Sequence, residues 1–347
     1  MEDLEIYEVI NIMAFAVGLL FGAISQKSQF CFGGSIKDYV KEGSTQRAGS
    51  IVMAMISAIV TTYFITTYYD IDLSATPYLK ENINYFTVIL GGALFGTGMI
   101  IADGCTARHM VKFSSGDTYS IISLIFIAIA AFATIKGVLN PIFMPLIQNQ
   151  TLLEISSYLS NFMVNIYFLV AILVALLIFL MKNDLKKIVY LYDGVLIGIL
   201  VGLMWYITGY IGADSFERTI SLGSLSFIYS SGETLQTITE YNLFELKYSV
   251  VLIFGIFFGA FIMSLFSKKK TASCCVVNEV QNKKLQSKII GGIMMGIGGV
   301  LAIGCTVGQG LTGLSTLAFS SLVAISAIMI SAYFTIRFQK ERSENKQ

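Results

Sequence analysis

"GGALFGTGMIIADGC", residues 91–105, sets two glycines four positions apart in an apolar run and ends on a cysteine nine positions after the second glycine. The same frame, Gly-x3-Gly-x8-Cys, recurs in "GLLFGAISQKSQFC" (18–31) and in "GIMMGIGGVLAIGC" (292–305). A fourth stretch, "GILVGLMWYITGYI" (198–211), has both glycines but carries Ile211 where the cysteine would be. Self-similarity at a fixed frame indicates an internal repeat. The sequence therefore predicts four copies of one unit, three of which end on a cysteine.

The composition places the chain in a membrane. Of its 347 residues, 55% are hydrophobic, 13% are charged and one is histidine, and the mean hydropathy is +0.73. A soluble protein of this size contains more charge. The opening "MEDLEIYEVI" lacks the basic region and the cleavage site of a signal peptide, so we expect the first apolar segment to remain as a helix among lipids. The net charge of +1 argues against nucleic acid as a partner.

Apolar runs long enough to cross a bilayer occur nine times along the chain. They cover residues 9–25, 48–69, 84–102, 118–138, 162–181, 191–212, 248–266, 289–303 and 314–336. The run at 289–303 is short enough to be one arm of a broken helix. The predicted fold class is thus an all-α polytopic membrane protein with about nine transmembrane helices and some broken or re-entrant segments.

The basic residues predict the orientation of these helices. Cytoplasmic loops collect lysine and arginine, and most basic residues fall on the cytoplasmic side if the N-terminus is outside and the C-terminus is cytoplasmic. The helices before Cys31 and Cys105 then run inward, whereas the helix before Cys305 runs outward. We therefore expect a first membrane repeat at 1–181, a basic cytoplasmic linker at 182–190, and an inverted second repeat at 191–347. Transporters built from inverted repeats place the substrate path between the halves.

The segments after the cysteines predict breaks in the helices. They read "CFGGSIKD" (31–38), "CTARHMVKFSSGD" (105–117) and "CTVGQGLTGLS" (305–315), and each is rich in glycine or polar residues. Non-helical backbone at membrane depth is tolerated where it is buried in protein or lines a wet cavity. We therefore expect the three cysteines to line a pore. Close helix packing is the usual role of Gly-x3-Gly, and it does not explain the cysteines.

Backbone N–H groups and helix N-termini at such breaks favour an anion. The residues expected to contact it are Gly33, Gly34, Thr106, Arg108, His109, Thr306 and Gly308. Lys112 adds a further positive charge near the predicted cytoplasmic mouth. An ordinary alternative is that Arg108 and Lys112 are only the basic residues that mark a cytoplasmic helix end.

The segments "SQFCFGGSIKD", "ADGCTARHMVKFSSGD" and "AIGCTVGQGLTGLS" resemble the cysteine motifs of the YeeE/YedE family of sulphur-transport membrane proteins. The resemblance covers nearly the whole chain, including one unit without a cysteine. It implies import of thiosulfate through the cytoplasmic (inner) membrane of a prokaryote. In that family three cysteines, here Cys31, Cys105 and Cys305, pass the ion along by transient S–H hydrogen bonds without a covalent step.

The resemblance also implies partners. Family members often work beside a soluble TusA-like sulphur carrier, and some branches are associated with selenium, so a selenium-containing or other reduced sulphur compound is the alternative substrate. Neither the residues nor the resemblance calls for a cofactor. Chemistry independently favours thiols, because a neutral S–H group donates a weak hydrogen bond to an anion. A weak donor suits an ion that must be recognised and then released.

Three other classes of function compete with transport of a sulphur anion. A membrane thiol or sulphur-transfer enzyme needs a reactive cysteine beside a base, and His109 lies four residues after Cys105. A copper(I) transporter needs soft sulphur ligands, but the 14 methionines are mostly dispersed in apolar segments, where they are typical packing residues. A purely structural membrane protein is the third alternative.

Two of the predicted loops have features of their own. "KKKTASCCVVNEVQNKK" places Cys274 and Cys275 in a basic loop expected in the cytoplasm, where the pair is either a contact for a sulphur carrier or a dispensable feature. The loop 213–247 is too long for a simple connector. We expect it to hold short helices near the outer entrance and to be the counterpart of 27–47.

Overall fold

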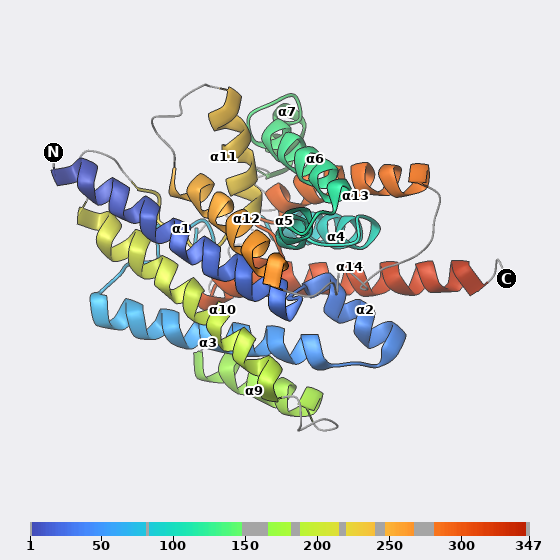
Figure 1. The fold of residues 1–347 in the computed structure, drawn as a ribbon, viewed down its shortest axis with the longest axis horizontal. Helices are drawn as coiled ribbons and strands as arrows, with labels where there is room; N and C mark the ends of the chain where they lie inside the picture. The colour runs from blue at the N-terminus through green and yellow to red at the C-terminus, as the bar shows by residue number, and fades with distance from the viewer. Residues whose placement is uncertain are drawn as a thin grey trace.

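The computed structural model describes residues 2–80, 83–147, 166–181, 188–214, 220–239, 247–266 and 281–344. These residues form helices and connecting turns, and no strand occurs among them. The long helices gather into one bundle, with the beginning of α1 and the end of α14 at opposite ends of its longest dimension (Figure 1). Cys274, Cys275 and residues 182–187 of the predicted linker lie outside the described residues.

Among the described residues, nine long helices overlap the nine predicted spans, one helix to each. They are α1 (Glu2–Ser28), α3 (Gln46–Tyr69), α4 (Tyr85–Ile101), α6 (Thr118–Ile135), α9 (Ile166–Met181), α10 (Ile188–Tyr206), α12 (Tyr248–Phe266), α13 (Gln281–Leu301) and α14 (Phe319–Glu344). Within the part of the chain that the structure describes, seven helical segments are long and apolar enough to cross a membrane, and the apolar parts of α9 and α13 are shorter. The predicted fold class, an all-α polytopic membrane protein, is confirmed.

Several helices extend beyond the apolar runs that predicted them. α1 begins at Glu2 rather than at residue 9, α13 begins at Gln281 rather than at 289, and α14 continues to Glu344 rather than to 336. A helix satisfies its own backbone hydrogen bonds whether its surface meets lipid or water. Counting apolar residues therefore finds the lipid-facing part of each helix and misses its polar ends.

Shorter helices fill the segments between the long ones. They are α2 (Phe32–Glu42), α5 (Thr106–Ser114), α7 (Asn140–Ile147), the π-helix η2 (Ile207–Ile211), the 3-10 turn η3 (Gly212–Asp214), α11 (Phe227–Thr239) and the π-helix η4 (Gly308–Gly313). α2, α5 and η4 follow the three cysteines, so the predicted helix breaks are confirmed. α11 supplies a short helix within 213–247, as expected, and its position relative to the membrane stays a prediction.

The Gly-x3-Gly pairs serve helix packing in all four units. α1 packs along α12, α3 along α10, α4 along α14 and α6 along α13. Gly18 and Gly22 face α12, Gly92 and Gly96 face α14, Gly198 and Gly202 face α3, and Gly292 and Gly296 face α6. A Cβ atom on most of these glycines would lie under 3 Å from an atom of the facing helix, so a larger residue would separate the two helices.

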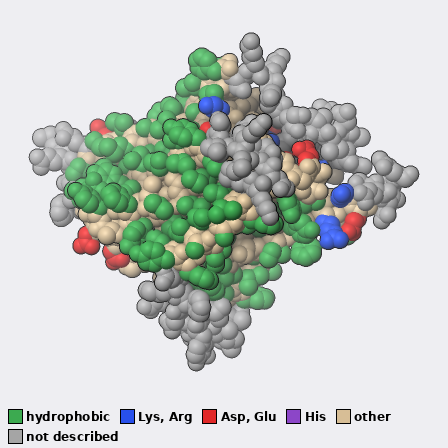
Figure 2. All heavy atoms as spheres, turned by 90° about the horizontal axis from the view of Figure 1, so that it is seen from below, with side chains coloured by type: hydrophobic (Ala, Val, Ile, Leu, Met, Phe, Trp, Pro, Cys, Tyr) green, Lys and Arg blue, Asp and Glu red, His purple; other side chains and the backbone are tan. Residues whose placement is uncertain are grey.

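The outside of the bundle is apolar. Hydrophobic side chains cover much of the described surface seen in Figure 2, and most of the charged side chains lie toward its left and right ends. Large apolar side chains such as Phe64, Phe179 and Phe334 are about two-thirds exposed. An apolar belt with charged ends is the surface expected of a protein that spans a membrane.

Candidate functional site

Each of the three buried cysteines follows the same kind of helix-ending turn. The residue two positions before the cysteine has a left-handed backbone. The residue directly before the cysteine donates its N–H to the carbonyl oxygen five positions earlier in the chain. This pattern is the Schellman motif. The left-handed residues are Gln29 (φ 58°), Asp103 (φ 63°) and Ile303 (φ 60°). Gly104 and Gly304 come next, with φ values of 153° and 158° that favour glycine. The repeated sequence frame is thus also a repeated local structure.

Each cysteine then starts the next short helix. The carbonyl oxygens of Cys31, Cys105 and Cys305 accept hydrogen bonds from the N–H groups four residues on, at 3.0, 2.9 and 2.7 Å. The Sγ atom of Cys31 accepts from the N–H of Gly34 at 3.2 Å, and the Sγ atom of Cys305 accepts from the N–H of Gly308 at 3.3 Å. A thiol that accepts from the backbone keeps its own S–H available as a donor.

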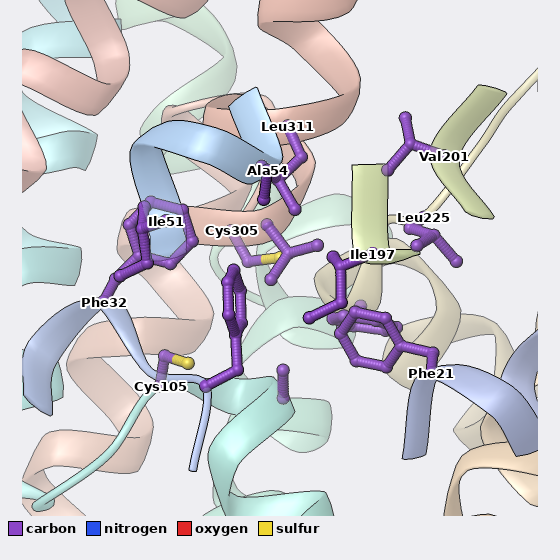
Figure 3. Packing of buried hydrophobic residues seen from close by; sticks show 14 of the residues in the cluster. Phe21, Phe32, Ile51, Ala54, Cys105, Ile197, Val201, Leu225, Cys305 and Leu311 are labelled. Carbon is purple, nitrogen blue, oxygen red and sulfur yellow. The ribbon is translucent and has the colours of Figure 1, made fainter. Parts of the chain in front are cut away.

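The three thiols are buried in the core of the protein, and we call them the thiol row. Cys31, Cys105 and Cys305 are free thiols with exposed fractions of 5%, 2% and 1%. The side chains of Cys31 and Cys105 interact with each other, and the Thr306 side chain interacts with Cys105. Thr306 directly follows Cys305 in the sequence, so the third thiol belongs to the neighbour of a residue that interacts with Cys105. Figure 3 shows Cys105 and Cys305 among the buried apolar side chains of the core.

A small charged pocket lies at the Cys31 end of this row. Cys31, Gly33 and Gly34 line it together with the side chains of four charged residues. These charged residues are Lys37, Asp103, Arg108 and Lys112. The cavity volume is about 10 Å³, which is room for no more than one water molecule. An anion larger than water therefore needs the lining side chains to move.

Arg108 and Lys112 are buried, with exposed fractions of 4% and 7%. Nη2 of Arg108 donates to Oε1 of Gln29, whereas Nη1 is buried without a hydrogen-bond partner among the described residues. Lys112 forms an ion pair of 3.0 Å with Asp103. Basic residues that only mark a cytoplasmic helix end stay in contact with water, so this alternative does not explain the burial of either side chain.

His109 belongs to a different polar group. Its ring is fully buried, and Nδ1 lies 3.2 Å from Oγ of Ser120, which itself donates to the carboxylate of Asp117 at 2.7 Å. Because Ser120 uses its proton on Asp117, the Nδ1–H of His109 is the donor in the first bond. The ring is thus held by the start of α6, and this contact gives no support to an enzyme in which His109 activates Cys105.

The remaining predicted residues lie beside the cysteines. Thr106 and Thr306 are fully buried, each directly after its cysteine. A Cβ atom on Gly33 would lie 3.2 Å from the side chain of Met99. A Cβ atom on Gly308 would lie 3.2 Å from Oγ of Ser226 and 3.6 Å from Sγ of Cys305. The glycines therefore keep the backbone close to the thiols, and contact between these residues and an anion stays a prediction.

Sequence reasoning missed two charged residues and one polar residue of this site. Lys37 and Asp103 form an ion pair, and Gln29 holds Arg108. Asp103 had a usable signal, because an acidic residue within an apolar run is unusual and costly. Gln29 has the equivalent place in the first copy of the frame, two positions before its cysteine.

No metal site supports the copper alternative within the described residues, since no three His, Cys, Asp or Glu side chains there could hold an ion together. Taken together, the apolar helices, the buried thiols and the cationic pocket define a multi-pass membrane protein with charged and polar groups buried in its core, as found in transporters. The chain belongs to the sulphur transport family, whose model matches residues 27–334. The resemblance to YeeE/YedE proteins is thereby confirmed.

Two relatives named thiosulfate transporter TsuA align with nearly the whole chain. The protein from Spirochaeta thermophila is 23% identical in an alignment of 330 positions that covers 89% of this chain and 92% of the relative. The protein from Escherichia coli is 23% identical in an alignment of 356 positions that covers 91% of each chain. The probable transporter YedE of Escherichia coli is 32% identical over 108 residues, or 31% of this chain and 24% of that protein. Family membership and the apolar helices together identify the chain as a membrane transport protein.

Proposed function

We propose that this protein imports thiosulfate across the cytoplasmic membrane along the row formed by Cys31, Cys105 and Cys305. The observation that carries the proposal is the set of three buried thiols on equivalent turns, two of which, Cys31 and Cys105, interact with each other. The two relatives that align along nearly their whole length are named thiosulfate transporters. A selenium-containing or other reduced sulphur anion is the alternative cargo for the same path.

The chemistry of the path fits a small anion with a terminal sulphur atom. The charged pocket beside Cys31 attracts the anion, and Arg108 offers it a buried donor. The thiols of Cys31 and Cys305 already accept backbone hydrogen bonds, so their S–H groups are directed to other acceptors. Each S–H···anion bond is weak, so the ion moves from one thiol to the next without a covalent step. Sulfate has no terminal sulphur and gains less from a soft thiol partner.

The helix pairs support the proposed inverted arrangement of the two halves. The first long helix of the first unit, α1, packs on the last helix of the third unit, α12, and the converse pair is α3 with α10. The second and fourth units show the same reciprocity, in the pairs α4 with α14 and α6 with α13. In the proposed topology, the N-terminus is outside and the C-terminus is in the cytoplasm. A soluble TusA-like carrier accepts the transported sulphur on the cytoplasmic side.

Growth rescue tests the proposed function. The chain is produced in a bacterium that lacks its own sulfate and thiosulfate uptake, with thiosulfate or sulfate as the only sulphur source. We expect growth on thiosulfate and little or no growth on sulfate, with uptake of labelled thiosulfate by the same cells. A well-produced membrane protein that supports neither growth nor uptake would contradict the proposal.

A further inference from the structure

We propose that the carboxylate of Asp103 is a built-in competitor of the transported anion. It binds Lys37 and Lys112 while the pocket is empty, moves aside when the anion arrives, and returns to help release it. The identity of the anion as thiosulfate rests on the proposed function. The contacts, charges and space around this carboxylate support its role.

Asp103 has the contacts that an anion in this pocket would make. Its Oδ1 atom pairs with Nζ of Lys37, and its Oδ2 atom pairs with Nζ of Lys112 at 3.0 Å. Lys37 belongs to α2, which follows Cys31, and Lys112 belongs to α5, which follows Cys105. One carboxylate thus holds together the two helices that start at neighbouring thiols. An oxyanion between the same two ammonium groups would form the same charge-assisted hydrogen bonds.

The net charge of the residues that line the pocket can balance a dianion. Lys37, Arg108 and Lys112 carry positive charge, and Asp103 is the acidic residue that lines the pocket with them. The lining therefore has an excess of two positive charges, and thiosulfate carries two negative charges. Nη1 of Arg108 is buried without a partner among the described residues, although a buried charged donor normally has one. This unfilled donor points to a ligand that is not part of the chain.

The space in the pocket requires a side chain to move. A cavity of about 10 Å³ does not admit an anion of several heavy atoms. The side chain of Asp103 is 27% exposed, compared with 13% for Lys37 and 8% for Lys112. Among these three ion-pair partners, Asp103 therefore has the most access to water, and rotation of its carboxylate toward water opens its place on both ammonium groups to the anion. Lys112 keeps its hydrogen bond of 2.6 Å to the backbone carbonyl of Asp103. This exchange replaces one anionic partner by another, so both lysines stay paired throughout.

The other two cysteine turns lack this carboxylate. The equivalent residue is Ile303 before Cys305 and Gln29 before Cys31. The competitor is thus confined to the end of the row where the cations lie. Beside Cys305, the hydroxyl groups of Tyr78 and Ser226 surround Gly308. The anion therefore meets strong, exchangeable ion pairs at one end of the path and weaker neutral donors at the other.

Binding of labelled thiosulfate to the purified full chain tests the inference. We expect the Asp103→Asn variant to bind at least about fivefold more tightly than the wild type, because the neutral amide competes weakly for the lysines. The matched control is Asp38→Asn, because Asp38 lies next to Lys37 in α2 and its carboxylate pairs with Arg47 of α3 at 3.2 Å. We expect a much smaller gain there. Equal or weaker binding by a folded Asp103→Asn variant would overturn the inference.

A second comparison keeps the inference testable if the Asp103→Asn variant does not fold. Lys37→Gln removes one cation, and we expect it to weaken binding. Adding Asp103→Asn to Lys37→Gln should strengthen binding again, since the competitor is gone, and a double variant no tighter than Lys37→Gln would overturn the inference. Absence of thiosulfate binding by the wild type would instead contradict the proposed function. The two failures are therefore distinguishable in one set of measurements.

Discussion

We expect the Cys105→Ala variant to take up thiosulfate at least about tenfold more slowly than the wild type, although the protein remains in the membrane. Cys105 lies in the middle of the row, between Cys31 and Thr306, and is 2% exposed. Alanine keeps the turn but removes the donor, and a buried polar group without its partner costs roughly 1–3 kcal/mol. The cost falls on the anion as it passes this point, because water has little access to replace the thiol.

The measurement is the initial rate of labelled thiosulfate uptake at matched membrane levels of each variant. Cys105→Ser keeps a hydroxyl donor of similar size, and we expect it to retain part of the activity. The matched control removes two other thiols, in the double variant Cys274→Ala with Cys275→Ala, and should transport normally. Cys31→Ala should lose less than Cys105→Ala, because Cys31 lines the pocket at one end of the row. Normal uptake by Cys105→Ala would contradict the relay.

The repeated frame made much of this site predictable. Three cysteines at one spacing from paired glycines predicted three equivalent helix breaks, and the structure has a left-handed residue two positions before each cysteine. Local sequence can predict such a turn because the hydrogen bonds that close it join residues only five positions apart. The glycine pairs likewise predicted close packing, though the sequence did not identify which helix each pair faces.

The ion pairs of the pocket could not be predicted in the same way. Lys37 and Asp103 are separated by 66 positions, and they meet only because α2 and the turn before Cys105 pack together. Gln29 and Arg108 are 79 positions apart. No periodic pattern links such residues, and in a single sequence a buried lysine resembles one at a cytoplasmic helix end. The polar partners therefore required the three-dimensional packing, whereas the thiols did not.

Close packing between α1 and α12 leads to the second prediction, that the Gly259→Ala variant loses stability and transports more slowly. Gly259 lies in α12, and a Cβ atom there would lie 1.9 Å from the carbonyl oxygen of Leu19 in α1 and 2.7 Å from its carbon. Neither atom can move without moving α1, and overpacking of this kind costs about 1–3 kcal/mol. Because α1 leads directly to Cys31, the same displacement should shift Cys31 away from Cys105 and lower uptake.

Thermal unfolding of the purified protein in detergent measures the effect, and Gly49→Ala is the matched control. Both substitutions add one methyl group to a glycine in a helix, but the nearest atom to a Cβ on Gly49 is 3.8 Å away. Alanine favours a helix over glycine by up to about 1 kcal/mol, so Gly49→Ala should be neutral or stabilising. Equal stability of the two variants would show that α1 and α12 do not meet at Gly259. If Gly259→Ala alone loses stability and uptake together, the close packing of α12 on α1 positions Cys31 for transport.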